Sequence, residues 1–172
     1  MNHIHCNELN HEHGEHNHVS KKDRLAMLLM VLIAAGIFLR PFIALQNTSR
    51  GDSFLNYGFY GRAISQYKRA ILLDKDNSKA YSWLGYAYNR NGDTDKAIES
   101  YKKAIELNPK DIEVNFELGS MYYVRYQETR EENCYKKAIK SFEKVLEIDP
   151  SNVNAKLMLD NLNEKDRVKG NE

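Results

Sequence analysis

Residues 78–111 read SKAYSWLGYAYNRNGDTDKAIESYKKAIELNPKD, and residues 112–152 read IEVNFELGSMYYVRYQETREENCYKKAIKSFEKVLEIDPSN. The second stretch repeats the first, with matches at Leu84/Leu118, Gly85/Gly119, Tyr88/Tyr122, Ala97/Ala138 and Pro109/Pro150. A weaker copy occupies about 44–77, and the three copies end alike: YKRAILLDKDN, YKKAIELNPKD and FEKVLEIDPSN. A repeat of about 34 residues is typical of supersecondary units that stack on one another.

Each copy predicts a pair of antiparallel helices. Gly85, Gly119 and Ala97 are small enough to let the two helices approach closely. Larger side chains would fill the space between the helices: Tyr88, Tyr101, Tyr122 and Phe142.

Turn and cap residues divide the copies into helices. Asn91-Gly92-Asp93 predicts the turn inside a repeat, and Pro109 and Pro150 predict the ends of second helices. Asp111 or Ser151 is expected to cap the helix that follows, and Thr48 or Ser49 to cap the first helix of the first copy. The prolines, Pro41 included, are expected at element boundaries.

This pattern of Leu-Gly, Tyr, Ala, an aromatic residue and Pro resembles the tetratricopeptide repeat (TPR) family over about 44–152. The resemblance implies an all-α, right-handed helical solenoid within 46–165, with repeats at about 44–77, 78–111 and 112–152. Arg50, Lys75 and Val145 depart from the family's usual residues.

Two further segments belong to this prediction. Seven additional residues around Tyr126–Tyr135 predict either two longer helices or a loop. Residues 153–165 predict a helix that caps the open end of the solenoid, and 166–172 predict a short polar tail.

An apolar run precedes the repeats. Leu25 to Leu39 contains no charge and no proline, and extending it to Leu45 gives 21 residues. A helix of that length spans about 31 Å, close to the hydrocarbon thickness of a bilayer. The run could also belong to a signal peptide, but no small-x-small cleavage site follows it. We therefore expect an uncleaved transmembrane helix over 25–45.

Positive charges flank this run unequally. Lys21, Lys22 and Arg24 precede it, whereas Arg40 and Arg50 are spread along the other side. The positive-inside tendency then favours a cytoplasmic N-terminal tail and extracytoplasmic repeats.

Composition excludes several classes of function. The 25 basic and 24 acidic residues nearly balance, which argues against a nucleic-acid partner. The two cysteines, Cys6 and Cys134, make no disulfide framework. The repeats contain no phosphate loop, no nucleophile elbow and no histidine that could act as a general base. We therefore expect that the protein is not an enzyme.

The family resemblance implies a peptide or helix bound in a concave groove lined by the first helix of each pair. The candidate groove residues are Ser82, Tyr86, Asn89, Arg90, Phe116, Ser120 and Tyr123. Chaperone-binding members hold a terminal carboxylate with lysine and asparagine, but Tyr86 and Ser120 stand where asparagine would be needed. Aromatic residues suit an apolar or amphipathic peptide; alternatively, some of them pack within the solenoid.

Residues 1–24 predict a disordered, histidine-rich tail. All six histidines lie within the first 18 residues, in three His-x-His pairs: His3, His5, His11, His13, His16 and His18. Imidazoles two residues apart can share Zn²⁺, Ni²⁺ or Cu²⁺. The alternative is a solvated low-complexity segment with no metal role. The repeats require no cofactor.

Together these features predict a membrane-anchored adaptor or accessory subunit. It would dock a membrane-bound or membrane-proximal protein through the groove. In architecture it resembles bacterial single-pass TPR proteins that serve membrane complexes. The alternative is a metal-handling protein, in which the histidine tail binds the metal and the repeats recruit a client.

Overall fold

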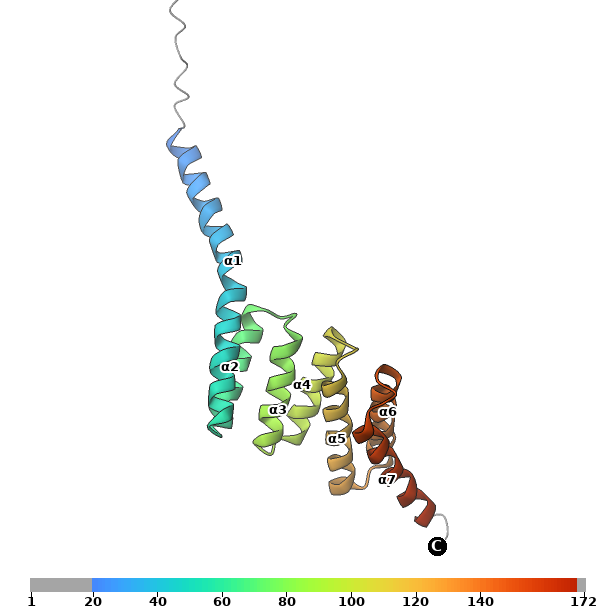
Figure 1. Ribbon diagram of the computed structural model, residues 1–172. Coiled ribbons are helices and arrows are strands. Elements are labelled where there is room, and N and C mark those ends of the chain that lie inside the picture. The colour runs from blue at the N-terminus through green and yellow to red at the C-terminus, as the bar shows by residue number, and fades with distance from the viewer. Residues whose placement is uncertain (1–19, 170–172) are drawn as a thin grey trace, which may run out of the picture. The chain divides into compact units, whose positions relative to one another are not determined.

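The computed structural model describes residues 20–169, and the side chains of residues 20–163. All regular secondary structure in this part of the chain is α-helical (Figure 1). The helices are α1 (Lys21–Asn56), α2 (Tyr60–Leu73), α3 (Ser78–Arg90), α4 (Thr94–Leu107), α5 (Ile112–Thr129), α6 (Glu132–Ile148) and α7 (Val153–Lys169). The prediction of an all-α, TPR-like solenoid is confirmed.

The chain divides into two compact units, Met1–Ile37 and Phe38–Glu172, and α1 contributes residues to both. Within the second unit, α3 pairs with α4 and α5 pairs with α6. α2 packs on α3, α4 on α5, and α7 on α6, so consecutive pairs stack into one solenoid (Figure 1).

In every repeat, a glycine of the first helix packs closely against an aromatic ring of the second helix. A Cβ atom built on the glycine would lie 2.5 Å, 2.8 Å and 2.9 Å from the nearest ring carbon in Gly51/Tyr67, Gly85/Tyr101 and Gly119/Phe142, respectively. Each ring is almost completely buried. The small residue predicted at this position therefore does allow the aromatic side chain of the second helix to reach the backbone of the first.

Three of the predicted turns and caps can be followed in the structure. Gly92, in the turn of the second repeat, has φ +83°, a conformation that favours glycine. Asp111 caps α5, since its Oδ1 accepts a hydrogen bond from the Val114 backbone N–H at 3.1 Å. The prediction of Ser151 as a cap is wrong. Asn152 caps α7 instead, because the Ser151 hydroxyl donates to Asp149 at 2.6 Å.

The first helix is longer than the sequence predicts. Thr48 and Ser49 lie inside α1 and cap nothing, and the Thr48 hydroxyl donates to the Ala44 carbonyl at 3.0 Å. Pro41 also lies inside α1, so the expectation that every proline marks a boundary is wrong. Burial of Ala44, Asn47 and Thr48 keeps this part of α1 helical, because side-chain packing outweighs local capping preferences.

The ends of the described part also differ from the predicted domain bounds. α1 begins at Lys21, inside the predicted 1–24 tail, and α7 continues to Lys169, beyond the predicted cap 153–165. The additional residues of the third repeat lengthen both helices. α5 and α6 have 18 and 17 residues, against 13 and 14 in α3 and α4.

α7 covers the open end of the third repeat with only part of its apolar surface. Leu162 is buried, and its carbonyl accepts a hydrogen bond from the Tyr135 hydroxyl at 2.9 Å. Leu159 is partly buried and packs against the hydrophobic cluster that contains Tyr135 and Leu162. Val153 and Leu157 are exposed.

Among the described residues, α1 is the one helix long and apolar enough to cross a membrane. The side chains of its apolar run, residues 25–45, are exposed except for the partly buried Ala35 and the buried Ala44. The core helix of a soluble protein would bury most of these side chains.

Candidate binding groove

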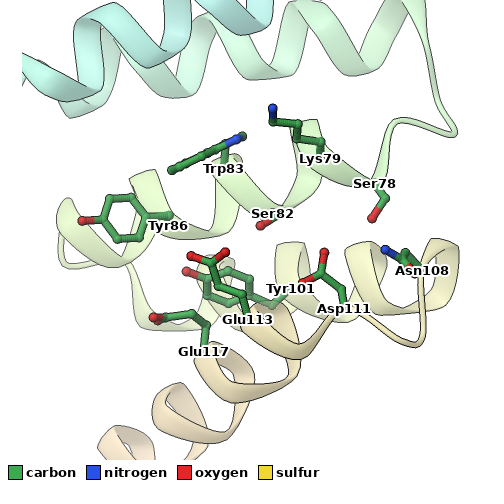
Figure 2. Close-up of a pocket in the computed structure, with 10 residues that line it drawn as sticks. All are labelled: Ser78, Lys79, Ser82, Trp83, Tyr86, Tyr101, Asn108, Asp111, Glu113 and Glu117. Carbon is green, nitrogen blue, oxygen red and sulfur yellow. The ribbon is translucent and has the colours of Figure 1, made fainter. Parts of the chain in front are cut away.

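A pocket of about 330 Å³ lies where α3 and α4 meet the start of α5 (Figure 2). Residues of α3 line one side, and residues at the start of α5 face them (Figure 2). Its lining consists of Ser78, Lys79, Ser82, Trp83, Tyr86, Tyr101, Asn108, Asp111, Glu113 and Glu117. We call this the acidic pocket, because three of these residues carry carboxyl groups.

A second pocket of about 600 Å³ adjoins it. It lies between the end of α1, the start of α2 and α3, and is lined by Leu55, Asn56, Tyr57, Gly58, Tyr60, Trp83, Tyr86 and Arg90. Trp83 and Tyr86 line both pockets, so the two pockets are neighbours along α3. We call these two neighbouring pockets together the groove.

The helical period of α3 separates its core residues from its groove residues. Leu84, Gly85, Ala87 and Tyr88 are buried, whereas Trp83 and Tyr86 are only partly buried. The Trp83 and Tyr86 rings meet edge to face, with centroids 6.0 Å apart and planes at 85°. This geometry is favourable for aromatic pairs and fixes two apolar surfaces at the centre of the groove.

Arg90 lies at the α2 end of the groove. Its guanidinium donates a hydrogen bond to the Tyr60 hydroxyl at 3.3 Å and lies 5.7 Å from the centre of the Tyr60 ring. Neither contact neutralises the charge, so this end of the groove is positive.

Tyr101 forms part of the wall of the acidic pocket. Its side chain is 1% exposed, and its hydroxyl has no hydrogen-bond partner among the residues that the structure describes. Burial raises the pKa of Tyr101, and the nearby charge of Glu117 raises it further. In the first repeat the equivalent Tyr67 donates to Asp52 Oδ1 at 2.8 Å. The second repeat has Tyr86 in place of Asp52, so the Tyr101 hydroxyl lacks that acceptor.

Glu113 and Glu117 are four residues apart on α5, so their side chains share one helix face. Burial raises the pKa of Glu117, and the charge of Glu113 raises it further. Within the described part of the chain, no salt bridge includes either carboxylate. The amino group of Lys79 points away from the carboxyl groups (Figure 2).

The structure brings three of the seven predicted groove residues together. Ser82 and Tyr86 line the acidic pocket, and Tyr86 and Arg90 line the second pocket. Asn89 is partly buried and lines neither of them.

The remaining three candidates lie on α5. Phe116 and Tyr123 pack against the core of the third repeat, with Phe116 5.3 Å from Phe142 between ring centres. The Ser120 hydroxyl donates to the Phe116 carbonyl at 3.1 Å. This placement matches the alternative reading, in which some of these residues pack within the solenoid.

Several residues that line the acidic pocket were not among the candidates predicted from the sequence. The chain's single tryptophan, Trp83, and the like-charged pair Glu113/Glu117 were detectable signals. The unpartnered Tyr101 hydroxyl was not detectable, because it depends on how α3, α4 and α5 pack.

The six histidines of the predicted metal site lie outside the described residues. In the part that the structure describes, no group of three or more His, Cys, Asp or Glu side chains is placed to hold a metal ion.

Three family models match the chain: Tetratricopeptide repeat over 78–111, TPR repeat over 51–92, and Tetratricopeptide repeat over 131–152. The chain contains tetratricopeptide repeats. The match over 78–111 coincides with the predicted second repeat, the match over 51–92 spans parts of the first and second repeats, and the match over 131–152 covers the second half of the third. No curated protein sequence matches the chain.

Solved TPR structures share the fold. The first TPR of Spaghetti (RPAP3), bound to the HSP90 peptide SRMEEVD, has a TM-score of 0.66 at 22% identity, over 73% of this chain and 94% of that one. The Arabidopsis OM64 TPR domain has a TM-score of 0.65 at 19% identity, over 73% and 98%. MamA has a TM-score of 0.67 at 22% identity, over 88% and 87%.

Proposed function

We propose that this protein is a membrane-anchored adaptor that docks a partner protein in the groove formed by the end of α1, the start of α2, and α3, α4 and α5. The observation that carries the proposal is the pair of neighbouring pockets along α3, with Trp83 and Tyr86 lining both. Partly exposed aromatic residues in a concave surface are typical anchors for a bound polypeptide.

The structural relatives support this use of the groove. Three are described as complexes with short peptides: both TPRs of Spaghetti (RPAP3) with SRMEEVD of HSP90, and the second TPR domain of human RPAP3 with SGPTIEEVD of HSP70. A TPR domain is thus able to bind a short peptide, which supports a peptide segment as the occupant of the groove here.

The apolar part of α1 supplies the proposed anchor. Its exposed side chains would be unfavourable in water and favourable in a bilayer. The absence of a small-x-small sequence after the run favours a retained helix over a cleaved signal peptide. We further propose a cytoplasmic N-terminus and extracytoplasmic repeats, from the positive charges before the run.

Anchoring restricts which partners the repeats meet. A domain tethered to the bilayer encounters other membrane proteins at a high effective concentration. Tethering does not raise the effective concentration of soluble proteins. We therefore propose that the partner is membrane-bound or membrane-proximal.

Filling the groove tests the proposal. Ser82→Trp would place a large side chain in the acidic pocket, whereas Ser65→Trp, exposed on α2 and outside both groove pockets, is the matched control. Each full-length variant is solubilised from membranes and its retained partner is quantified. We expect a loss of about tenfold or more for Ser82→Trp alone, with unchanged thermal unfolding for both variants. Equal retention by the two would contradict docking in the groove.

The histidine tail motivates a second, separate proposal, that it binds Zn²⁺, Ni²⁺ or Cu²⁺. Three His-x-His pairs in 18 residues favour it. Calorimetric titration of the full chain with ZnCl₂, compared with a chain carrying asparagine at all six positions, measures the contribution of the tail. Equal binding by the two chains would contradict metal binding by these histidines.

A further inference from the structure

We propose that the acidic pocket receives a lysine or arginine side chain of the partner polypeptide. The inference rests on the proposed docking function and adds the chemistry of the bound segment. Three observations carry it: unpaired carboxylates, an unpartnered buried hydroxyl, and an aromatic wall.

The carboxylates give the pocket its charge preference. Asp111, Glu113 and Glu117 line it, and Lys79 is the only basic residue in the lining. Asp111 also caps α5, but Glu113 and Glu117 have no cationic partner in the described part of the chain. A cation placed between them would relieve their mutual repulsion. The peptides in the structural relatives end in EEVD, and these carboxylates would repel such a peptide.

The buried hydroxyl gives the pocket a hydrogen-bonding preference. Tyr101 is 99% buried, as its 1% exposure shows, and its oxygen is unpartnered in the pocket wall. Buried polar groups in folded proteins nearly always have partners. Because the hydroxyl oxygen has almost no accessible surface, the neighbouring side chains would have to shift slightly before it could accept a hydrogen bond from an ammonium or guanidinium group held between Glu113 and Glu117.

The aromatic wall suits an organic cation. Trp83 and Tyr86 present their edge-to-face pair to the pocket, and a guanidinium or ammonium group is attracted to such rings. The groove already contains one example, Arg90 over the Tyr60 ring at 5.7 Å. A metal ion is disfavoured, because no group of three His, Cys, Asp or Glu side chains in the described part of the chain is placed to ligate one.

The position of Arg90 decides which pocket takes the basic side chain. Arg90 makes the second pocket positive, while the acidic pocket is negative. A bound segment would therefore place its basic residue against α5 and continue past Trp83 toward α2. The opposite direction would bring two cations together.

Trp83 provides a direct readout, because it is the only tryptophan in the chain and lines the pocket. The purified full chain in non-ionic detergent is titrated with a blocked octapeptide of alanine and leucine containing one central arginine. Matched peptides carry neutral citrulline or glutamate at that position. We expect a saturable change in Trp83 fluorescence, with the arginine peptide bound about tenfold more tightly than the citrulline peptide. Equal affinity, tighter binding of the glutamate peptide, or the same response to calcium chloride would overturn the proposal.

Variants locate the binding. Glu113→Gln with Glu117→Gln should weaken arginine-peptide binding about tenfold or more, while Glu143→Gln, exposed on α6, should leave it unchanged. Tyr101→Phe should weaken it severalfold without lowering the melting temperature. A full response in the double variant would place the peptide elsewhere and overturn the proposal.

The test of the cation pocket and the test of docking in the groove can fail independently. If Ser82→Trp removes the membrane partner but the double glutamine variant retains it, docking in the groove stands and the cation pocket does not. If Ser82→Trp retains the partner, docking in the groove is itself wrong.

Discussion

A methyl group on Gly85 would lie 2.8 Å from Cδ1 of the Tyr101 ring. This approach is closer than van der Waals contact, so α3 and α4 can pack at their observed separation only with glycine at position 85. Gly51 and Gly119 stand in the same relation to Tyr67 and Phe142. The same contact therefore sets the spacing of the helices in all three repeats and supports the frame on which the groove is built.

Gly85→Leu should destabilise the repeats, because its side chain would push α3 from α4. Overpacking of this kind typically costs about 1–3 kcal/mol. Gly61→Ala is the matched control, since a Cβ at Gly61 meets nothing within 4 Å and alanine favours a helix. Thermal unfolding of the full chain in detergent measures both. An unchanged melting temperature in Gly85→Leu would mean that the contact does not fix the helix spacing.

The two buried tyrosines of the first and second repeats should respond oppositely to loss of the hydroxyl. Tyr67→Phe removes the hydrogen bond to Asp52 and should lower the free energy of unfolding by about 1–2 kcal/mol. Tyr101→Phe removes a hydroxyl that has no partner, and should leave stability unchanged or raise it by up to about 1 kcal/mol. Equal destabilisation by both substitutions would show that Tyr101 has a partner in solution.

Glu117 should give the repeats a pH-dependent instability. Its pKa in the folded chain lies above the ordinary value of 4.5, chiefly through burial and then through Glu113. The penalty is therefore absent below the unfolded pKa and complete once the pH exceeds the folded pKa. Glu117→Gln should raise the free energy of unfolding by a few tenths of a kcal/mol at about pH 7 and by nothing near pH 4. Chemical denaturation of Glu117→Gln and Glu143→Gln at both values measures it, and equal gains at the two pH values would exclude titration of Glu117.

The apolar run of α1 should hold the full chain in membranes. We expect the protein to pellet with membranes, to resist extraction by alkaline carbonate, and to keep its N-terminal residues by mass spectrometry. Replacing both Leu28 and Leu32 with arginine should release it, at about 2.5–3.5 kcal/mol of lost insertion energy per residue. Leu72→Arg is the control, because Leu72 lies on α2 and its side chain is exposed. A soluble wild-type chain would refute the anchor.

Local patterns predicted the repeats well because each signal acts within one helix pair. Gly85, Gly119, Tyr101 and Phe142 occupy the predicted close approach, and Asp111 caps the helix after it. The prediction of a cap at Thr48 or Ser49 failed because burial of the neighbouring Ala44 and Asn47 keeps that segment helical. Ser151 and Asn152 are both good caps in adjacent positions, and the Ser151 contact with Asp149 decided between them.

The groove was less predictable, since its lining comes from separate helices. Tyr86 could be assigned to the groove from the family resemblance, but the position of Tyr101 beside Glu113 and Glu117 results from the packing of α4 against α5. Likewise, the sequence alone left open whether Phe116 faces a partner or the core, and its contact with Phe142 depends on α6.

The most direct measurement of docking in the groove is a photo-cross-link from two positions on α3. p-Benzoylphenylalanine is placed in the full chain either at Tyr86, which lines the groove, or at Tyr81, which lines a different pocket beside Lys68 and Tyr88. Both positions are partly buried tyrosines of one helix, so local structure and labelling chemistry are matched. After irradiation of intact membranes, the account predicts a discrete adduct with the partner protein from position 86 and none from position 81. An adduct from position 81 alone, or from neither position, would contradict it.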